Sequence, residues 1–128
     1  LDVFRRMIAA HGGDGRVVDD ALRLPQPGAT VEVPAPTSGS IAFVDAQALG
    51  HLVLQLGGGR KTTADTIDPA AGIDRLVQAG ETVEAGQPLM RLLAKNAALA
   101  ESLAAAAATA VHITQKPVLA RRLILESI

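Results

Sequence analysis

The spacing of hydrophobic positions predicts a helix at the start of the chain. Leu1, Phe4 and Ile8 fall near one helical face, and the charged positions between them fall off that face. Gly12 follows, and because glycine accepts the positive φ of a helix C-cap, we expect the helix to end there. A short second helix is expected over residues 17–24, before prolines break the chain in a linker or turn.

From residue 30 onwards the hydrophobic period shortens to two, which predicts strands. The segments TVEV (30–33) and SGSIAFV (38–44) alternate and contain β-branched residues. Further strands are expected over residues 72–77 and 88–94. A last strand is expected over residues 118–125, where leucines alternate imperfectly with arginines.

Helical spacing returns in two segments of the second half. Asp45 is placed to cap a helix that ends abruptly at three consecutive glycines, residues 57–59. Asn96 is placed to cap a helix running to about His112, rich in alanine, the best helix former. This order of elements predicts an α+β fold, with a small sheet or barrel and helices packed outside it. The expected aliphatic core consists of Val44, Leu49, Val53, Leu56, Val83, Leu89 and Leu92.

Composition narrows the classes of partner. The chain has 128 residues, enough for one domain with a flanking piece, and 48% of them are hydrophobic. Only 2% are aromatic and the net charge is −1, which argues against nucleic-acid binding by base stacking or by a basic surface. The lack of cysteine excludes disulfides and cysteine-ligated zinc. No apolar run reaches the roughly 18 residues that span a bilayer, so we expect no membrane partner and a cytoplasmic location.

The glycine loop GGGRK, residues 57–61, is the motif that most resembles a ligand site. Glycines let backbone N–H groups approach an anion, and Arg60 and Lys61 supply positive charge. A phosphate-binding P-loop, however, has the order strand, G-x-x-x-x-G-K-[ST], helix, whereas these glycines follow a helix. A helix-terminating loop is therefore the favoured interpretation. Arg60 and Lys61 remain candidates for the lining of a cleft. The alternative, which is slightly favoured, is that Arg60 braces the loop through a carboxylate such as Asp65 or Asp68.

The other titratable residues do not form a recognisable catalytic or metal site. The histidines are scattered along the chain, and the carboxylates of the 60–75 region lack the ligand series of a calcium loop. We expect these carboxylates to serve as caps and turns. No catalytic residue, no metal ligand and no cofactor is therefore assigned. The residues considered are His11, His51, His112, Asp65, Asp68 and Asp74.

Two stretches resemble biotinyl and lipoyl carrier domains. APTSGSI (35–41) and GETVEAGQPL (80–89) resemble the turns and short strands of that barrel-sandwich arrangement. A carrier needs its modified lysine at a hairpin tip between hydrophobic residues, and Lys61 and Lys95 lack that setting. A carrier or binding module is the alternative hypothesis.

The whole sequence resembles a narrower family, the pyrimidine-nucleoside phosphorylases, and among them the bacterial thymidine phosphorylases. Four stretches resemble the C-terminal part of these enzymes in order and spacing. They are FRRMIAAHGGD (4–14), TSGSIAFVDAQALG (37–50), LQLGGGRKTTADTIDPAAGI (54–73) and GETVEAGQPLMRLLAKN (80–96). Leu93 and Pro69 depart from the family pattern, so a preference for thymidine over uridine is left open.

The resemblance implies a fold, a division into parts and a function. It implies a small strand-rich domain of barrel-sandwich or hammerhead type with flanking helices. Residues 1–29 would be a helical segment and linker from the preceding large domain, and residues 30–128 the C-terminal domain. The full enzyme, a pentosyltransferase, would convert thymidine and phosphate to thymine and 2-deoxyribose 1-phosphate.

The same resemblance places the catalytic groups upstream of this chain. Its first residue, Leu1, is not a methionine, and we expect the chain to be a piece of a longer protein. The partners implied are the large phosphate-binding domain, phosphate, a pyrimidine nucleoside and a second enzyme copy, contacted through a helical domain outside this chain. The chain alone is expected to be inactive.

Overall fold

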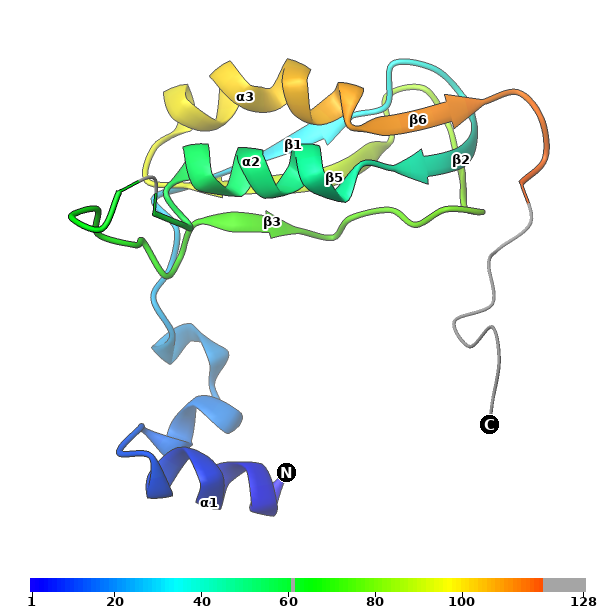
Figure 1. Ribbon diagram of the computed structural model, residues 1–128. Helices are drawn as coiled ribbons and strands as arrows, with labels where there is room; N and C mark the ends of the chain where they lie inside the picture. Colours follow the sequence, from blue (N-terminus) through cyan, green and yellow to red (C-terminus); the bar gives the residue numbers. More distant parts are fainter. Residues whose placement is uncertain (61, 119–128) are drawn as a thin grey trace, which may run out of the picture.

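The computed structural model describes residues 1–60 and 62–118. A helical N-terminal segment leads through an extended linker into an α+β domain (Figure 1). The segment contains helix α1 (Asp2–Ala10) and two short 3₁₀ turns, η1 (Gly15–Val18) and η2 (Ala21–Arg23).

The N-terminal helix is confirmed and the second predicted helix is wrong. Helix α1 ends beside Gly12, whose φ of +79° is the left-handed conformation expected after a helix. Residues 17–24 do not form an α-helix, because Asp14 and Asp20 each accept the backbone N–H two residues ahead. Each aspartate thereby caps a separate 3₁₀ turn, and the longer helix cannot form across Asp20.

Two three-stranded antiparallel sheets form the domain. One has the order β1-β5-β3 and the other β4-β2-β6, and neither closes into a barrel within the described residues. Two helices complete the domain, α2 (Ala46–Leu56) and α3 (Ala97–Thr109). The strands are β1 (Ala29–Pro34), β2 (Gly39–Val44), β3 (Gly72–Asp74), β4 (Thr82–Val83), β5 (Pro88–Ala94) and β6 (Val111–Thr114). The predicted α+β class is confirmed.

The first two strands follow each other in the sequence but do not pair with each other. Strand β1 pairs with β5, with Val31 opposite Leu92, whereas β2 pairs with β4 and β6. The register of β1 breaks at Pro34, which has no N–H to continue the ladder. The chain therefore leaves one sheet there and enters the other.

Two predicted boundaries change in the structure. Helix α3 ends at Thr109 rather than near His112, because the β-branched residues that follow pair with β2 as strand β6. Strand β3 stops at Asp74, since the next residue, Arg75, has a left-handed φ of +48°. The strand expected over residues 118–125 lies almost wholly outside the described residues.

The core lies between the two sheets and helices α2 and α3. One face of the β1-β5-β3 sheet, including Val33, Met90 and Leu92, is buried with the helices' side chains. The other face is open and carries Thr30 and Arg91, because side chains alternate along each strand. Of the predicted core residues, Leu49, Leu56, Val83, Leu89 and Leu92 are buried, while Val44 and Val53 are half-buried.

Candidate functional site

The glycine loop after α2 is closely packed. Gly57 has a φ of +106° and ends the helix, and its carbonyl accepts the Asp68 N–H at 2.9 Å. A Cβ added to Gly58 would lie 2.9 Å from the backbone carbonyl oxygen of Ala71. The glycines are thus required for turning and for close approach of the backbone, which confirms the interpretation as a helix-terminating loop.

The guanidinium of Arg60 projects from this loop without a partner among the described residues. Two carboxylates nearby were alternatives for bracing it. The carboxylate of Asp68 instead accepts a following backbone N–H at 2.9 Å, and that of Asp65 accepts from the Thr62 N–H and hydroxyl. Arg60 is exposed, and its side chain bonds to neither of them. Lys61 lies outside the described residues.

A second polar cluster crosses the open face of the β1-β5-β3 sheet. Arg91, on the central strand, donates from Nε to Asp74 Oδ1 at 2.7 Å and from Nη2 to Oδ2. The antiparallel register places Glu32 of β1 opposite Arg91 on its other side. Hydrogen bonding to the Arg91 guanidinium lowers the pKa of Asp74 and, reciprocally, raises that of Arg91. Asp74 is therefore part of a cross-strand ion pair, not the cap or turn expected from the sequence.

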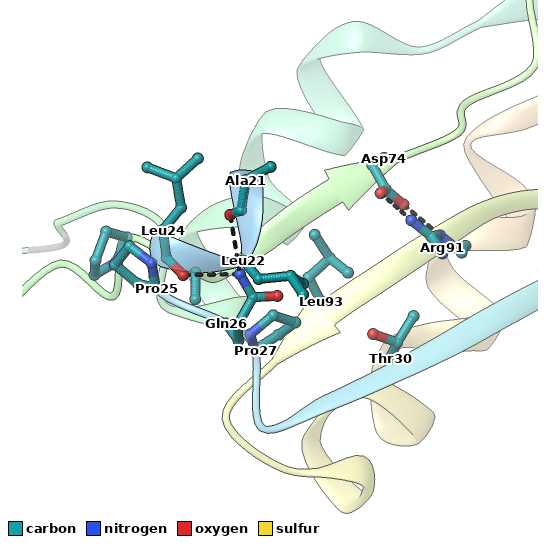
Figure 2. Close-up of a pocket in the computed structure, with 12 residues that line it drawn as sticks. Ala21, Leu22, Leu24, Pro25, Gln26, Pro27, Thr30, Asp74, Arg91 and Leu93 are labelled. Atoms are coloured by element: carbon teal, nitrogen blue, oxygen red, sulfur yellow. Dashed lines mark hydrogen bonds and ion pairs between the residues drawn. The ribbon is translucent and has the colours of Figure 1, made fainter. Parts of the chain in front are cut away.

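The open sheet face forms one wall of a cleft of about 590 Å³ (Figure 2). The linker and η2 form the opposite wall. Pro69 and Ala70, at the end of the loop that follows the three glycines, also line the cleft. The ion pair lies apart from the leucines and prolines of that wall in Figure 2, so the cleft has an apolar part and a charged part. The lining includes Leu22, Leu24, Pro27, Thr30, Arg91 and Leu93.

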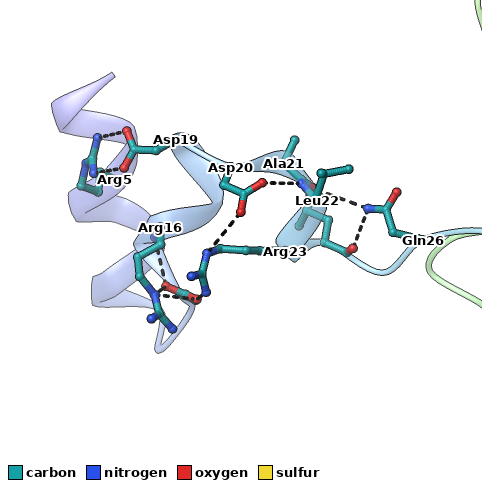
Figure 3. Close-up of polar contacts among 10 residues, drawn as sticks. Arg5, Arg16, Asp19, Asp20, Ala21, Leu22, Arg23 and Gln26 are labelled. Atoms are coloured by element: carbon teal, nitrogen blue, oxygen red, sulfur yellow. Dashed lines mark hydrogen bonds and ion pairs between the residues drawn. The ribbon is translucent and has the colours of Figure 1, made fainter.

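A third polar cluster fixes the shape of the N-terminal segment (Figure 3). Arg5 of α1 donates two hydrogen bonds to Asp19, at 2.6 and 2.8 Å. Asp14 accepts from Arg16 at 2.8 Å and from Arg23 at 3.4 Å. The bonds from Arg16 lower the pKa of Asp14 to about 2. These contacts join α1, η1 and η2 into one unit.

The histidines do not gather into a site. His11, His51 and His112 are exposed, and the His112 ring lies 5.4 Å from that of Phe43 on the β2-β6 pair. Across the described part of the chain, no three histidine or carboxylate side chains are placed to hold a metal ion. In the same residues no serine or threonine hydroxyl is hydrogen-bonded to a histidine. The described residues therefore contain no hydroxyl nucleophile paired with a histidine base.

Comparison with known families decides which resemblance holds. The family model described as the pyrimidine nucleoside phosphorylase C-terminal domain matches residues 40–114. The chain belongs to this family. The match covers five of the six strands and both domain helices, so it extends over most of the α+β domain.

Curated relatives of this phosphorylase domain carry consistent names. A Burkholderia cenocepacia protein named thymidine phosphorylase is 43% identical over 98 residues, which are 76% of this chain and 22% of the relative. A Burkholderia lata protein of the same name is 44% identical over 98 residues, again 76% and 22%. A Bacillus subtilis protein named pyrimidine-nucleoside phosphorylase is 36% identical over 104 residues, or 81% and 24%. The chain thus spans about a quarter of the length of these relatives.

The carrier hypothesis is not supported by these relatives. The two carrier-like stretches do lie together, since Ser38 Oγ accepts the Ala85 N–H at 2.9 Å and the Ala35 N–H reaches the Gln87 carbonyl at 2.8 Å. Lys95 follows β5 and precedes α3, so it is not at a hairpin tip. The two stretches are thus in contact in this domain, but Lys95 does not occupy the hairpin tip that a carrier needs.

No helix in the described residues is long and apolar enough to cross a membrane.

The sequence reasoning missed the Arg91–Asp74 pair and the cleft beside it. The strand pattern placed both residues in strands, but only the antiparallel register brings them opposite each other.

Proposed function

We propose that this chain is the C-terminal part of a thymidine phosphorylase. The observation that carries the proposal is the family match over residues 40–114, together with relatives at 43–44% identity that are named thymidine phosphorylase. Because the chain spans only 22% of those relatives, the activity belongs to the longer enzyme. This chain contributes architecture to it.

The reaction is a pentosyl transfer to phosphate. A phosphate oxygen attacks C1′ of thymidine, the bond from C1′ to the ring nitrogen breaks, and the electron pair leaves with the base. Thymine forms when that nitrogen gains a proton, and the sugar leaves as 2-deoxyribose 1-phosphate. The catalytic groups come from the upstream part of the enzyme, and the 128-residue chain alone is inactive.

Residues 1–29 belong structurally to the preceding large, phosphate-binding domain, and residues 30–128 form the C-terminal domain. The distribution of exposed apolar side chains supports this division. Among the residues that the structure describes, six of the eight large exposed hydrophobics lie in residues 1–24, and α1 has no buried residue. They are Leu1, Val3, Phe4, Met7, Leu22 and Leu24. Such a surface suits contact with further polypeptide.

Arg60 and Lys61 border the active-site cleft of the full enzyme without doing chemistry. The guanidinium of Arg60 is exposed and unbonded within the described residues, which supports this role because it is available to attract an anionic substrate. The family resemblance motivates a further assignment, a homodimer formed through the helical domain outside this chain. The cytoplasmic location expected from the sequence is kept as part of the proposal.

The test is phosphorolysis by the intact enzyme. The full-length protein is purified and incubated with thymidine or uridine, with and without phosphate, and base release is followed. We expect thymine release that requires phosphate and none from the 128-residue chain at equal concentration. Lack of phosphate-dependent release of either base by the folded full-length protein contradicts the proposal, and release by the 128-residue chain contradicts its inactivity.

A further inference from the structure

The β1-β5-β3 sheet is covered on one face only. Helix α3 packs across β1 and β5, and α2 packs beside it against β3 and β5. The opposite face carries two rows of residues that run across the strands. One row consists of Thr30, Leu93 and Gly72, and the other consists of Glu32, Arg91 and Asp74. A three-stranded sheet can leave a face to solvent, so its openness alone does not identify a binding surface.

The composition of the open face argues for a covered state. Leu93 is half-buried and apolar, and the neighbouring Gly72 leaves open space where a side chain would stand. The charge next to this row is already compensated, because Arg91 and Asp74 are joined by two hydrogen bonds. A neutralised, bidentate pair costs less to cover than a single charge. The face thus combines an apolar hollow and a paired charge with the exposed carboxylate of Glu32, which lies beside Arg91 on β1.

The path of the chain shows which polypeptide lies nearest this face. The linker enters β1 at Gly28, which packs directly on the Lys95 backbone. The linker and η2 form the wall of the cleft that faces the open side of the sheet. The side chains on this wall are accessible, since Leu22 is 78% exposed and Leu24 is 50% exposed. In Figure 1 the N-terminal segment lies on the side of the sheet away from α3. The polypeptide leading into this domain therefore approaches from the open side.

We propose that the open face of the β1-β5-β3 sheet, defined by Thr30, Glu32, Asp74, Arg91 and Leu93, is the surface on which the upstream part of the phosphorylase docks. This inference rests on the proposed function, because the occupant is the remaining three quarters of that enzyme's length. The apolar hollow at Leu93 receives an apolar side chain of the upstream polypeptide. The Asp74–Arg91 pair becomes buried at the edge of the contact.

Thiol accessibility tests this docking directly, because the chain contains no cysteine. Thr30→Cys and Glu32→Cys place reporters on the open face, and Gln55→Cys places a matched control on the exposed side of α2. Each variant is made in the full-length enzyme and in the 128-residue chain, whose core is formed by its own residues. The rate of maleimide labelling is measured by mass spectrometry on the peptide that contains the reporter cysteine. Each rate is divided by the rate of the same variant in urea, which corrects for the intrinsic reactivity of the thiol.

In the full-length enzyme we expect both open-face reporters to label at least about tenfold more slowly than Gln55→Cys. In the 128-residue chain all three are expected to label at similar rates. Equal rates in the full-length enzyme overturn the docking surface. Protection already present in the 128-residue chain also overturns it, and a rise of that protection with concentration identifies a second copy as the occupant. Phosphorolysis by the unmodified full-length enzyme tests the proposed function separately, so either idea can fail without the other.

Discussion

At the scale of single residues, Gly28 shows how tightly the linker is attached to the domain. A Cβ at this position would lie 2.0 Å from the Lys95 carbonyl oxygen, which is backbone and cannot rotate away. A Cβ on Gly50, in the middle of α2, would have nothing within 4 Å. Close packing therefore requires glycine at position 28, whereas the space around position 50 would accept a side chain.

Gly28→Ala is expected to destabilise the chain by about 1–3 kcal/mol, the usual cost of overpacking. Gly50→Ala is the matched control and is expected to stabilise it by about 0.5–1 kcal/mol, because alanine is favoured over glycine inside a helix. Urea unfolding of both variants measures the difference. A loss below about 0.5 kcal/mol for Gly28→Ala would mean that the linker is free to move away from Lys95.

The Asp74–Arg91 pair predicts a pH dependence whose sign follows from the lowered pKa of Asp74. A carboxyl with a folded pKa below its unfolded value of about 3.9 stabilises the fold above that value. The stabilisation is lost as pH falls through the folded pKa. The effect is small, because the Asp74 side chain is 39% exposed.

We expect Asp74→Asn to lower the stability of the 128-residue chain at pH 7, and the difference from the unmodified chain to shrink as pH falls through the folded pKa of Asp74. Chemical denaturation at several pH values measures this convergence. Glu101→Gln is the control, at an exposed carboxylate of α3, and leaves the Arg91 contact intact. A stability difference for Asp74→Asn that stays constant from pH 7 to pH 2 would contradict an ionic contribution.

At the scale of elements, starts of helices were predictable because their caps are local. Asp45 accepts the Ala48 N–H at 3.0 Å and Asn96 accepts the Leu99 N–H at 2.9 Å, as their sequence positions indicated. The end of α3 was not predictable from its run of alanines. It is determined by pairing of β6 with β2, strands that lie far apart in sequence.

Pairing between strands also accounts for what the sequence pattern missed on the open sheet face. Alternation identified β1 and β5 as strands, but it contains no information on which strand pairs with which. The Arg91–Asp74 pair and its cleft depend on that register, so the sequence pattern did not reveal them. The glycine loop was predictable because the left-handed turn at Gly57 is a local requirement.

Strand β5 is central in its sheet, and its burial predicts a large effect of truncation. Leu89 has no exposed surface, so Leu89→Ala is expected to cost about 2–5 kcal/mol. Leu22→Ala, at a leucine that is 78% exposed, is expected to change stability by less than about 0.5 kcal/mol. Urea unfolding of the 128-residue chain compares the two. Similar small effects at both positions would show that the core is wrongly placed.

At the scale of the whole molecule, the structure separates a self-sufficient domain from a segment that is not. The α+β domain buries its own aliphatic core, whereas α1 buries none of its side chains. Ion pairs hold the N-terminal segment in shape, but its apolar side chains stay exposed. This contrast is the physical basis for assigning residues 1–29 to the preceding domain of the proposed enzyme.

The role of Arg60 can be decided only in the full-length phosphorylase. Its guanidinium is exposed and, among the described residues, unbonded, so removing it breaks no contact that stabilises the loop. A cation bordering the cleft raises the local concentration of phosphate, and this long-range attraction weakens with salt. We therefore expect Arg60→Ala to raise the phosphate KM while leaving kcat and the Tm unchanged.

Steady-state kinetics at low and high salt test the electrostatic origin of that effect. The Debye length falls from about 10 Å at 0.1 M to about 3 Å at 1 M salt, so the KM difference between Arg60→Ala and the unmodified enzyme is expected to shrink. Arg6→Ala, at an exposed arginine of α1, is the matched loss of one charge and leaves the phosphate KM unchanged. A lower Tm with unaltered kinetics would instead assign Arg60 to bracing the loop, because a brace contributes to stability at every phosphate concentration.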